Sequence, residues 1–544
     1  MRVAYIKTMQ NERVFFISKK SYLPGNIDAR VVGSKAYGLV RMSAAGLPVP
    51  PAVVLGTGFC FDFFDNNEQV SSGFKELLIS NIRHIENISG LTFGGSRKPL
   101  LISVRSGAPV SMPGMMETIL NIGLCEKSVH GLIRMTGNSR MVWDTYRRLI
   151  VGVATIVYHC SKHPFDKILE EHLKKAKVDS VYMLDSLSLK KLTISFLSCF
   201  KNLTTFDFSQ DPYEQLEKSV IAVFYSWNSK KAKEYRKINK LVNLPGTAVT
   251  IQQMVFGNFG GTSGSGVAFT RDPATGEDKI YLDFVFNAQG EDIVSGKNFV
   301  DNQYKLKTIL PDIYDEIKNI KAKLENEFKD MQEFEFTIAD EKLYLLQTRM
   351  GKRTDYASLH IVIDMVKEKL ISIKEALKRI SHIDLEKIKK VSINKGSLHK
   401  ILGYATPASY GIISGKIAFN KETALKYKNE RESVILIKDA ILTEDISILN
   451  LVDGILTAKG GKTSHAAVVA RELNKVCIVG CDSITINSDK GFCLFSDTKV
   501  YEGDYICMDG NSGYIYLGNP EITIERPEEY LEEVRKWKRE FGKV

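Results

Sequence analysis

The hydrophobic period of this chain changes several times along its length, so neither a single sheet nor a single bundle fits the whole of it. Residues 1–110 mix short strand-like runs with glycine turns, whereas 125–240 place apolar residues at helical spacing. Residues 246–350 return to strand-like runs such as KIYLDFVF and KLYLLQT, and 400–516 combine short strands with short helices. Over 544 residues, these changes predict several structural units in a mixed α/β and α+β multidomain fold.

The composition argues against a nucleic-acid-binding protein, a membrane protein and a secreted protein. The chain has 74 basic and 64 acidic residues and a formal charge of +10, without an aromatic-interleaved basic motif. Nucleic-acid binding therefore has no support beyond charge, and polyanionic small substrates such as nucleotides fit the same surplus. No apolar run approaches the roughly 20 residues that span a bilayer, and the N-terminus lacks the features of a secretion signal. These features predict a cytoplasmic protein without a membrane segment, whose eight cysteines are free thiols.

Two basic residues lie beside turns that suit phosphate binding. Arg105 ends the apolar run PLLISVR and precedes a Ser-Gly-Ala-Pro turn, where a guanidinium group can hold a phosphate with two parallel hydrogen bonds. A structural ion pair is the alternative for Arg105. Lys35 follows Gly33 and Ser34 just before a helical run, where its ammonium can act as a point charge against phosphate.

A glycine-rich stretch, MVFGNFGGTSGSGVAFTRDPATGE, joins two strand-like runs at residues 254–277. The pattern predicts a glycine-rich hairpin, because it matches neither GxxxxGK[ST] nor GxGxxG. Gly260, Gly261 and Gly264 are candidate nucleotide-binding positions, since glycine lets backbone N–H groups approach an anion closely. A hairpin tip without a ligand is the alternative.

The next strand-like runs carry a set of polar side chains with a spacing of two. Glu333 and Glu335 lie two apart, so both carboxylates project from one face, and two carboxylates together favour a cation such as Mg²⁺. Gln347 and Arg349 repeat the spacing on the following run. Antiparallel pairing of the two runs would bring Glu335, Gln347 and Arg349 to one sheet edge, whereas a solvated strand face is the alternative.

The stretch GGKTSHAAVVAR at 460–471 predicts a glycine turn followed by a helix. Thr463 or Ser464 is a natural N-cap, which leaves His465 in the first helical turn. There a phosphoryl group on the imidazole would lie near the unpaired N–H groups and the positive end of the helix. A neutral imidazole is a nucleophile, so the alternatives are a phosphoryl carrier and a histidine that caps its own helix.

Several long stretches resemble the pyruvate phosphate dikinase family of phosphoenolpyruvate-utilising enzymes. GGKTSHAAVVAR is similar to the phosphohistidine signature, and SVRSGAPVSMPGMMETILNIGL, FGNFGGTSGSGVAFTRDPATGE, NAQGEDIVSG and EFTIADEKLYLLQTRMGKRT agree in order and spacing. The resemblance implies an ATP-grasp-like nucleotide-binding domain at 1–354 with a helical insertion near 125–240. A helical linker at 355–399, a compact swivelling phosphohistidine domain at 400–516 and a C-terminal helical linker at 517–544 would follow.

The resemblance also implies roles for single residues, which are carried over by position. Lys35 and Arg105 would contact the nucleotide phosphates, Glu335 and Gln347 would belong to the nucleotide and magnesium site, and Glu333 would add negative charge there. Arg349 would reach a terminal phosphate. His465 would be the phosphocarrier, with Thr463 and Ser464 beside it. The cofactors implied are ATP and Mg²⁺.

Two local departures from the family pattern stand out. Lys462 occupies a position where the family usually has methionine, and Ser34 replaces a glycine of the usual GGKG turn, with Tyr37 crowding the same loop. The extra cation of Lys462 would either stabilise the phosphoryl group or disfavour a protonated His465 by like-charge repulsion.

The activity implied is ATP- and phosphate-dependent phosphorylation of His465, giving AMP and pyrophosphate. The phosphoryl group would pass to pyruvate to form phosphoenolpyruvate on a TIM barrel, which needs roughly 250 residues beyond this sequence and would come from a separate subunit or a missing domain. Alternatives are another protein or small-molecule acceptor, or a degenerate regulatory module. The resemblance suggests a homodimer, and the swivel predicts hinges at 384–399 and 505–525.

Overall fold

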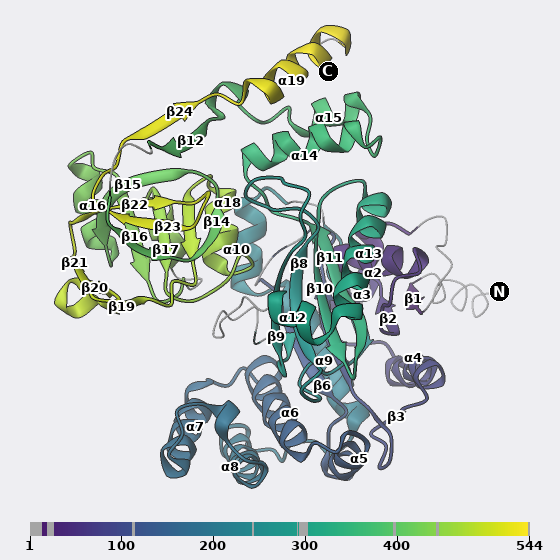
Figure 1. Ribbon diagram of the computed structural model, residues 1–544. Helices are drawn as coiled ribbons and strands as arrows, with labels where there is room; N and C mark the ends of the chain where they lie inside the picture. Colours follow the sequence, from purple (N-terminus) through teal and green to yellow (C-terminus); the bar gives the residue numbers. More distant parts are fainter. Residues whose placement is uncertain are drawn as a thin grey trace. The chain divides into compact units, whose positions relative to one another are not determined.

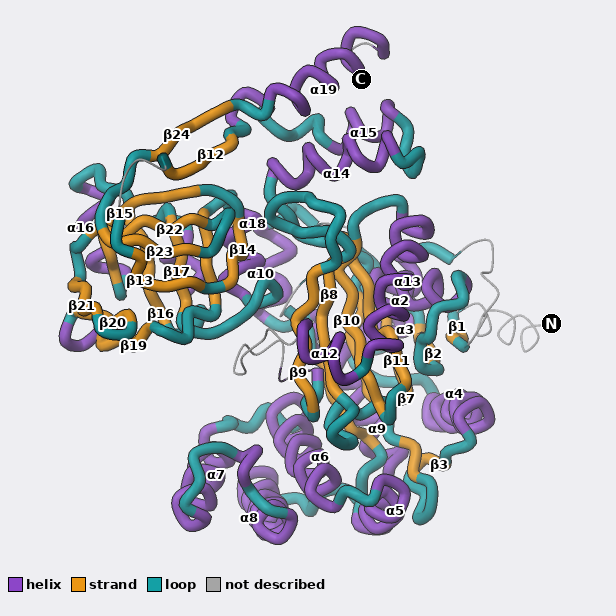
Figure 2. Tube along the Cα trace, viewed as in Figure 1, coloured by secondary structure: helices purple, strands orange, loops and turns teal. Residues whose placement is uncertain are grey.

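The computed structural model describes residues 13–18, 27–110, 112, 115–241, 244–290, 292, 303–394, 399–441 and 445–541 (Figures 1 and 2). The chain divides into two compact units, of which the first comprises Met1–Gly260 with Leu343–Gln347 and the second comprises Gly261–Lys342 with Thr348–Val544. No helix within the described ranges is long and apolar enough to cross a bilayer. The predicted mixed α/β multidomain architecture is confirmed, whereas the boundaries at 354, 399 and 516 stay predictions.

The first unit is built on a five-stranded sheet in the order β1-β2-β7-β5-β6, with every neighbouring pair antiparallel. One face of its central strands is apolar, since Val53, Val104 and Ile251 lie in register and are all fully buried. The strands are β1 (Val14–Ile17), β2 (Ala52–Leu55), β5 (Ile102–Gly107), β6 (Thr118–Ile122) and β7 (Ala248–Gln253). A short parallel pair, β3 (Thr92–Phe93) and β4 (Pro99–Leu100), lies outside this sheet.

Helices fill the predicted insertion at 125–240, and apolar side chains at helical spacing join one core with the sheet, among them Leu149, Phe196 and Val223. Figure 1 shows α6, α7 and α8 side by side. The helices of the insertion are α5 (Glu126–Thr136), α6 (Ser139–Gly152), α7 (His163–Ala176), α8 (Ser186–Thr204), α9 (Pro212–Trp227) and α10 (Lys230–Ile238). Before it come α2 (Ala29–Ala44), α3 (Thr57–Asp65) and α4 (Phe74–Ser89).

A second sheet has four strands in the order β11-β10-β8-β9. Asp340 (φ 51°) and Glu341 (φ 59°) form the two-residue turn between β10 and β11, a backbone geometry that suits a tight antiparallel hairpin. The expectation that these two runs are neighbouring strands is confirmed. The strands are β8 (Gly264–Phe269), β9 (Tyr281–Phe286), β10 (Gln332–Ala339) and β11 (Lys342–Met350), with helices α12 (Gln303–Ile309) and α13 (Pro311–Phe328).

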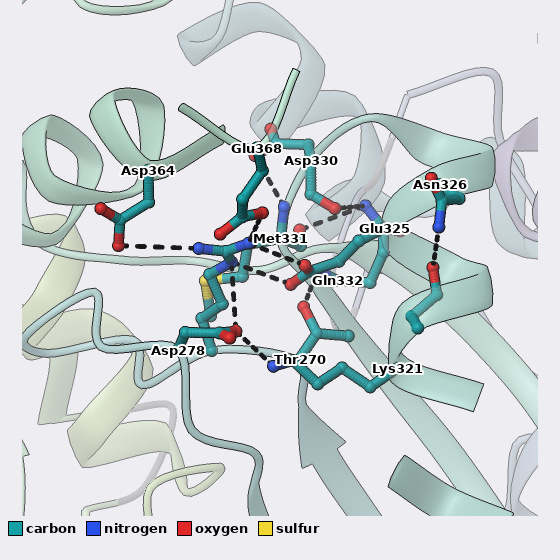
Figure 3. A network of polar contacts seen from close by, with 12 residues as sticks. Thr270, Asp278, Lys321, Glu325, Asn326, Asp330, Met331, Gln332, Asp364 and Glu368 are labelled. Atoms are coloured by element: carbon teal, nitrogen blue, oxygen red, sulfur yellow. Dashed lines mark hydrogen bonds and ion pairs between the residues drawn. The ribbon is translucent and has the colours of Figure 1, made fainter. Parts of the chain in front are cut away.

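A buried arginine ties this sheet to the helices that follow it. Arg271, directly after β8, is 1% exposed, and its guanidinium lies among four carboxylates that Figure 3 labels. It donates to Glu325 of α13 at 3.1 and 3.0 Å and to Glu368 at 2.6 Å, with Asp278 and Asp364 at 3.8 Å. Glu368 follows α14 (Asp355–Lys367), so one side chain links the end of a strand to two helices.

The C-terminal helix α19 (Glu528–Phe541) packs against α14 and α15 (Ile373–Arg379). Its apolar face buries Leu531, Val534 and Trp537 in the same core as Ile361 and Leu377. The segment that the sequence suggests as a linker helix is therefore part of a hydrophobic core in the second unit.

The chain from β13 to β23 forms an eight-stranded sheet in the order β13-β23-β22-β15-β16-β17-β18-β14. Strands β15 to β18 are parallel neighbours, and each step between them crosses over through a helix. The strands are β13 (Ile401–Tyr404), β14 (Thr406–Ser409), β15 (Ile412–Ala418), β16 (Val434–Lys438), β17 (Gly454–Thr457), β18 (Val476–Val479), β22 (Tyr505–Asp509) and β23 (Tyr514–Leu517). The crossover helices are α16 (Lys421–Asn429), α17 (Ile446–Leu449) and α18 (His465–Glu472).

The two chain segments that enter and leave this region pair with each other. Strand β12 (Lys390–Ile393) runs antiparallel to β24 (Ile522–Glu525), with Lys390 opposite Glu525 and Ile393 opposite Ile522. Both strands lie within or beside the predicted hinges, although residues 395–398 of the first hinge lie outside the described residues. A small sheet of β19 (Ile484–Asn487), β20 (Phe492–Phe495) and β21 (Thr498–Tyr501) completes the region.

Candidate functional site

In the first unit, Arg105 and Gln347 contact each other although 242 positions separate them. Arg105 of β5 donates from Nη2 to Gln347 Oε1 at 3.1 Å and from Nη1 to the Leu346 carbonyl at 3.0 Å. Arg105 is half-buried and Gln347 is buried. The structure therefore brings together two of the residues predicted to contact the nucleotide.

The turn that carries Lys35 packs against the end of the Arg105 strand. Helix α2 is kinked at Gly33 (φ 78°, ψ 152°), and a Cβ atom there would lie 2.2 Å from the Gly107 carbonyl oxygen. The backbone N–H and the hydroxyl of Ser34 both donate to the Ala108 carbonyl, at 2.8 and 3.0 Å. The hydroxyl of Ser34 therefore adds a hydrogen bond to this contact, which places Lys35 next to the end of β5.

The glycine-rich stretch is not a hairpin, and this prediction is wrong. Strand β7 before it belongs to the five-stranded sheet and β8 after it to the four-stranded sheet, so the stretch connects two sheets. A Cβ atom at Gly260 or Gly261 would meet nothing within 4 Å, whereas at Gly264 it would lie 2.2 Å from the Phe284 ring. Gly264 is thus a buried strand residue with a packing reason to be glycine, and phosphate binding at these positions stays a prediction.

Glu333 and Arg349 form an ion pair in the four-stranded sheet. Glu333 is 4% exposed, and its Oε1 accepts from Arg349 Nη2 at 2.5 Å. Its other oxygen, Oε2, is buried and has no hydrogen-bond partner among the described residues. A buried carboxylate oxygen of this kind is costly unless something pairs with it, so the atom is suited to a cation or another ligand.

The remaining members of the predicted magnesium set are Glu335 and Gln347. Glu335 is half-buried on β10, and Gln347 is buried on β11. Within the described ranges, no group of three or more His, Cys, Asp or Glu side chains is arranged to hold a metal ion. A magnesium site made of Glu333, Glu335 and Gln347 stays a prediction.

His465 is the first residue of α18, at the carboxyl end of the parallel strand β17. Ligands of open α/β sheets bind beyond this end of the strands. His465 is exposed, and the two alanines that follow it are buried. The predicted placement in the first helical turn is confirmed.

Ser464 occupies the N-cap position with extended backbone (φ −65°, ψ 160°). Its hydroxyl oxygen is buried and has no hydrogen-bond partner in the part of the chain that the structure describes. The helix start is instead closed by backbone bonds, because Ser464 N–H donates to the Gly461 carbonyl and Val468 N–H to the Ser464 carbonyl. The side-chain cap expected from Thr463 or Ser464 is therefore absent among the described hydrogen bonds.

The loop before His465 rests on two aspartates of the same unit. Asp283 of β9 is fully buried and accepts from the Thr463 hydroxyl at 2.9 Å and the Thr463 N–H at 3.2 Å. Its second oxygen accepts from the Tyr281 hydroxyl at 2.7 Å. Lys462 donates to Asp272 at 2.6 Å. The Lys462 ammonium is thus paired with a carboxylate instead of facing His465 as a free cation.

The far end of α18 is fixed to the chain just after β11. Arg471 is 1% exposed and donates from Nε to the Lys352 carbonyl at 3.0 Å and from Nη1 to the Ala408 carbonyl at 3.1 Å. Asn474 and Asp355 exchange two further hydrogen bonds, at 3.0 and 3.3 Å. Both ends of the histidine helix are therefore held by polar contacts.

The chain is similar to known proteins over both its nucleotide-binding part and the part that contains His465. Residues 70–315 match the family model "Pyruvate phosphate dikinase, AMP/ATP-binding domain", and residues 430–513 match "PEP-utilising enzyme, mobile domain". Pyruvate, phosphate dikinase of Clostridium symbiosum is 40% identical over 522 residues, which are 95% of this chain and 60% of that protein. The chain carries the nucleotide-binding and mobile domains of the pyruvate phosphate dikinase family.

Two further dikinases show the same extent of similarity. The protein of Entamoeba histolytica is 38% identical over 522 residues, 95% of this chain and 59% of its own length. The chloroplastic dikinase of Flaveria pringlei is 38% identical over 534 residues, 97% of this chain and 56% of its own length. The chain thus spans less than two thirds of the length of the curated dikinases it matches.

Three residues beside the dikinase-type histidine loop were not predicted from the sequence. Asp272 lies in the TRDPATGE stretch, and Tyr281 and Asp283 lie in the run KIYLDFVF. A single carboxylate in an apolar strand, such as Asp283, indicates a polar contact, since a buried charge needs partners. Its partner, Thr463, lies 180 positions away and cannot be read from either local pattern.

Proposed function

We propose that this chain catalyses the ATP- and phosphate-dependent phosphorylation of His465, as the first part of a pyruvate phosphate dikinase-type reaction. The observation that carries the proposal is an exposed histidine at the start of α18, beyond the carboxyl end of β17, in a chain with the family's nucleotide-binding domain. The reaction type follows from the similarity to enzymes named pyruvate, phosphate dikinase.

In the proposed step, His465 attacks as a neutral imidazole and forms a P–N bond to the β-phosphorus of ATP, releasing AMP. Inorganic phosphate then accepts the γ-phosphoryl group, which gives pyrophosphate and leaves one phosphoryl group on the histidine. The N–H groups of the first turn of α18 and its positive end favour the resulting negative charge. Neutral imidazole nitrogen is the form that reacts.

The residues that would hold the nucleotide are those predicted from the sequence. Lys35 and Arg105 would contact its phosphates, and the Arg105–Gln347 pair and the Ser34–Ala108 bonds support their placement. Glu333, Glu335 and Gln347 would hold Mg²⁺, which supplies charge neutralisation on the polyphosphate when bound. The unpaired Glu333 Oε2 among the described residues supports this assignment, and Arg349 beside it would reach a terminal phosphate.

The final acceptor belongs to the same proposal. Phosphoryl transfer from His465 to pyruvate, giving phosphoenolpyruvate, would take place at a keto-acid site on a barrel domain or a separate subunit. Transfer to another protein or small molecule is the competing outcome, and the addition of pyruvate to phosphorylated protein separates the two.

The test uses ATP labelled at the β-phosphorus, with and without inorganic phosphate, on the whole chain. We expect acid-labile, base-stable label on the wild type that depends on His465 and is lost in His465→Ala. The matched control is His382→Ala, which removes an exposed histidine of the same unit and should label normally. Absence of label on the wild type contradicts the proposed activity, and label that survives His465→Ala contradicts the carrier assignment.

A further inference from the structure

Lys462, three residues before His465, is a buried lysine. Its side chain is 6% exposed, and its ammonium donates to Asp272 Oδ2 at 2.6 Å and lies 4.4 Å from the centre of the Tyr281 ring. Lysine is almost never this buried unless its charge is paired, so the position requires Asp272. The cation is held by the chain between β8 and β9, which lies 190 positions earlier.

Asp272 is held in place independently of Lys462. Its Oδ1 accepts from the N–H groups of Ala274 and Thr275, at 2.8 and 3.1 Å, which fixes the turn after β8. Only Oδ2 faces the lysine. Burial would raise the pKa of Asp272, but the Lys462 charge and these hydrogen bonds hold that pKa below its usual value. The acceptor is therefore an ionised carboxylate in a fixed position.

The neighbouring loop residues Gly461 and Thr463 contact Asp283 through close packing and through uncharged hydrogen-bond donors. A Cβ atom at Gly461 would lie 2.6 Å from Asp283 Oδ2, so the backbone there is pressed against the carboxylate. Thr463 donates to the same oxygen from its N–H and its hydroxyl. Lys462 adds a charged contact to this loop at a position where the sequence resembles a family that usually has methionine.

We infer that Lys462 is a positioning residue, which holds the loop 460–464 and the adjoining His465 docked on the β8–β9 segment through its ion pair with Asp272. It acts through the loop and not on the reacting atoms, because its ammonium is already bonded to Asp272 and its charge is buried. The catalytic consequence rests on the proposed function, whereas the docking itself does not.

The docking test is hydrogen exchange of the loop amides in the whole chain, followed by mass spectrometry. The Thr463 N–H donates to Asp283 Oδ2, so its exchange reports undocking directly. Loss of a charge-assisted bond in Lys462→Met should speed exchange of this amide about ten- to hundredfold. Lys462→Arg, which keeps the charge, should restore slow exchange. Lys459→Met, an exposed lysine three positions away, is the matched control and should exchange like the wild type.

A double-mutant cycle separates the ion pair from packing. Asp272→Asn keeps an oxygen for the Ala274 and Thr275 N–H groups but removes the charge. We expect it to speed exchange as Lys462→Met does, and the double variant to be no faster than either single one. Unchanged exchange in Lys462→Met, or additive effects in the double variant, would overturn the inference.

The labelling assay connects docking to the reaction. Lys462→Met should lower the rate of His465 labelling several-fold with little change in the KM for ATP, and Lys462→Arg should recover the rate. A direct catalytic role of the cation would instead leave exchange unchanged while labelling falls, which overturns the positioning role. If the wild type takes no label but exchange responds as expected, the proposed activity fails and the docking role stands.

Discussion

At the scale of single residues, the loop 460–464 rests on the Asp283 carboxylate, whose ionisation is costly. Burial raises the pKa of Asp283 to about 6, although the Tyr281 hydroxyl, the two Thr463 donors and the Lys462 charge all act to lower it. The same carboxyl group in an unfolded chain has a pKa near 3.9. The folded protein therefore binds more protons at this site between about pH 4 and pH 6, and the stability it contributes is lost as the pH rises through that window.

This sign gives a pH-dependent prediction. The free energy of unfolding of the wild type, compared with that of Asp283→Asn, should fall by about 2 kcal/mol between pH 4 and pH 7. Urea titrations of both proteins across this range measure the difference. Asp489→Asn, which alters an exposed carboxylate of the same unit, should show no such difference from the wild type. A constant gap between wild type and Asp283→Asn at every pH would contradict the raised pKa.

At the scale of elements, helix α2 shows how a backbone kink positions a side chain. Gly33 adopts φ 78°, which permits the chain to approach Gly107 and lets Ser34 bond to Ala108. The helix continues beyond the kink with Val40 and Met42 in the core. Lys35 is thus placed by the close contact of two turns, one of them at the end of the Arg105 strand.

We predict that Gly33→Ala weakens ATP binding at least tenfold, because its Cβ would meet the Gly107 carbonyl oxygen and push the Lys35 turn away. Calorimetric titration with ATP and Mg²⁺ measures the affinity. Gly46→Ala is the matched control in the turn just after the same helix, since Gly46 has φ 74° but no atom within 4 Å of a Cβ. It should cost about 1 kcal/mol of stability and leave ATP affinity unchanged. Equal losses of affinity in both variants would mean that backbone strain alone, and not the contact, matters.

The sequence predicted the elements that are determined by residues close together in the chain, and it did not predict those that depend on pairing with distant strands. The helical insertion follows from apolar spacing within each segment, and the start of α18 at His465 follows from the glycine turn before it. The glycine-rich stretch between β7 and β8, which was predicted to be a hairpin, has the same local pattern whether it connects two strands of one sheet or joins two sheets. Only the long-range pairing of β7 with β2 and β5 decides that question.

The candidate site divides in the same way. Arg105, Glu333 and Arg349 are recognisable because a charged residue in a strand-like run is conspicuous, and the structure gives each a partner. Asp272 and Asp283 are also single charges near apolar runs, but their partners follow them by 190 and 180 positions. No period or spacing in a sequence encodes a pairing between residues so far apart.

At the scale of the whole molecule, the stability of the second unit depends on one buried guanidinium, that of Arg271. Arg271 joins the end of β8 to α13 and to the segment after α14, and among its partners Glu325 is also buried (Figure 3). Removing one partner of a buried pair leaves an uncompensated charge, which costs more than the pair itself contributes.

Arg271→Met should therefore destabilise the second unit by about 3–5 kcal/mol, seen as a lower urea midpoint of its unfolding transition. The combined change Arg271→Met with Glu325→Met should recover part of the loss, because it removes the buried charges together. Arg526→Met is the control, since Arg526 and its partner Glu386 are exposed, and it should change stability by less than about 1 kcal/mol. A similar loss in Arg526→Met, or no recovery in the combined variant, would contradict a role for the buried charge.

The pairing of β12 with β24 also constrains how this chain can change in evolution. The two strands meet residue by residue, from Lys390 opposite Glu525 to Ile393 opposite Ile522. An insertion of one residue into either strand would shift the register and turn every side chain beyond it to the opposite face. Length changes in the entering segment should therefore be inherited together with matching changes in the leaving segment, more than 120 positions later in the chain.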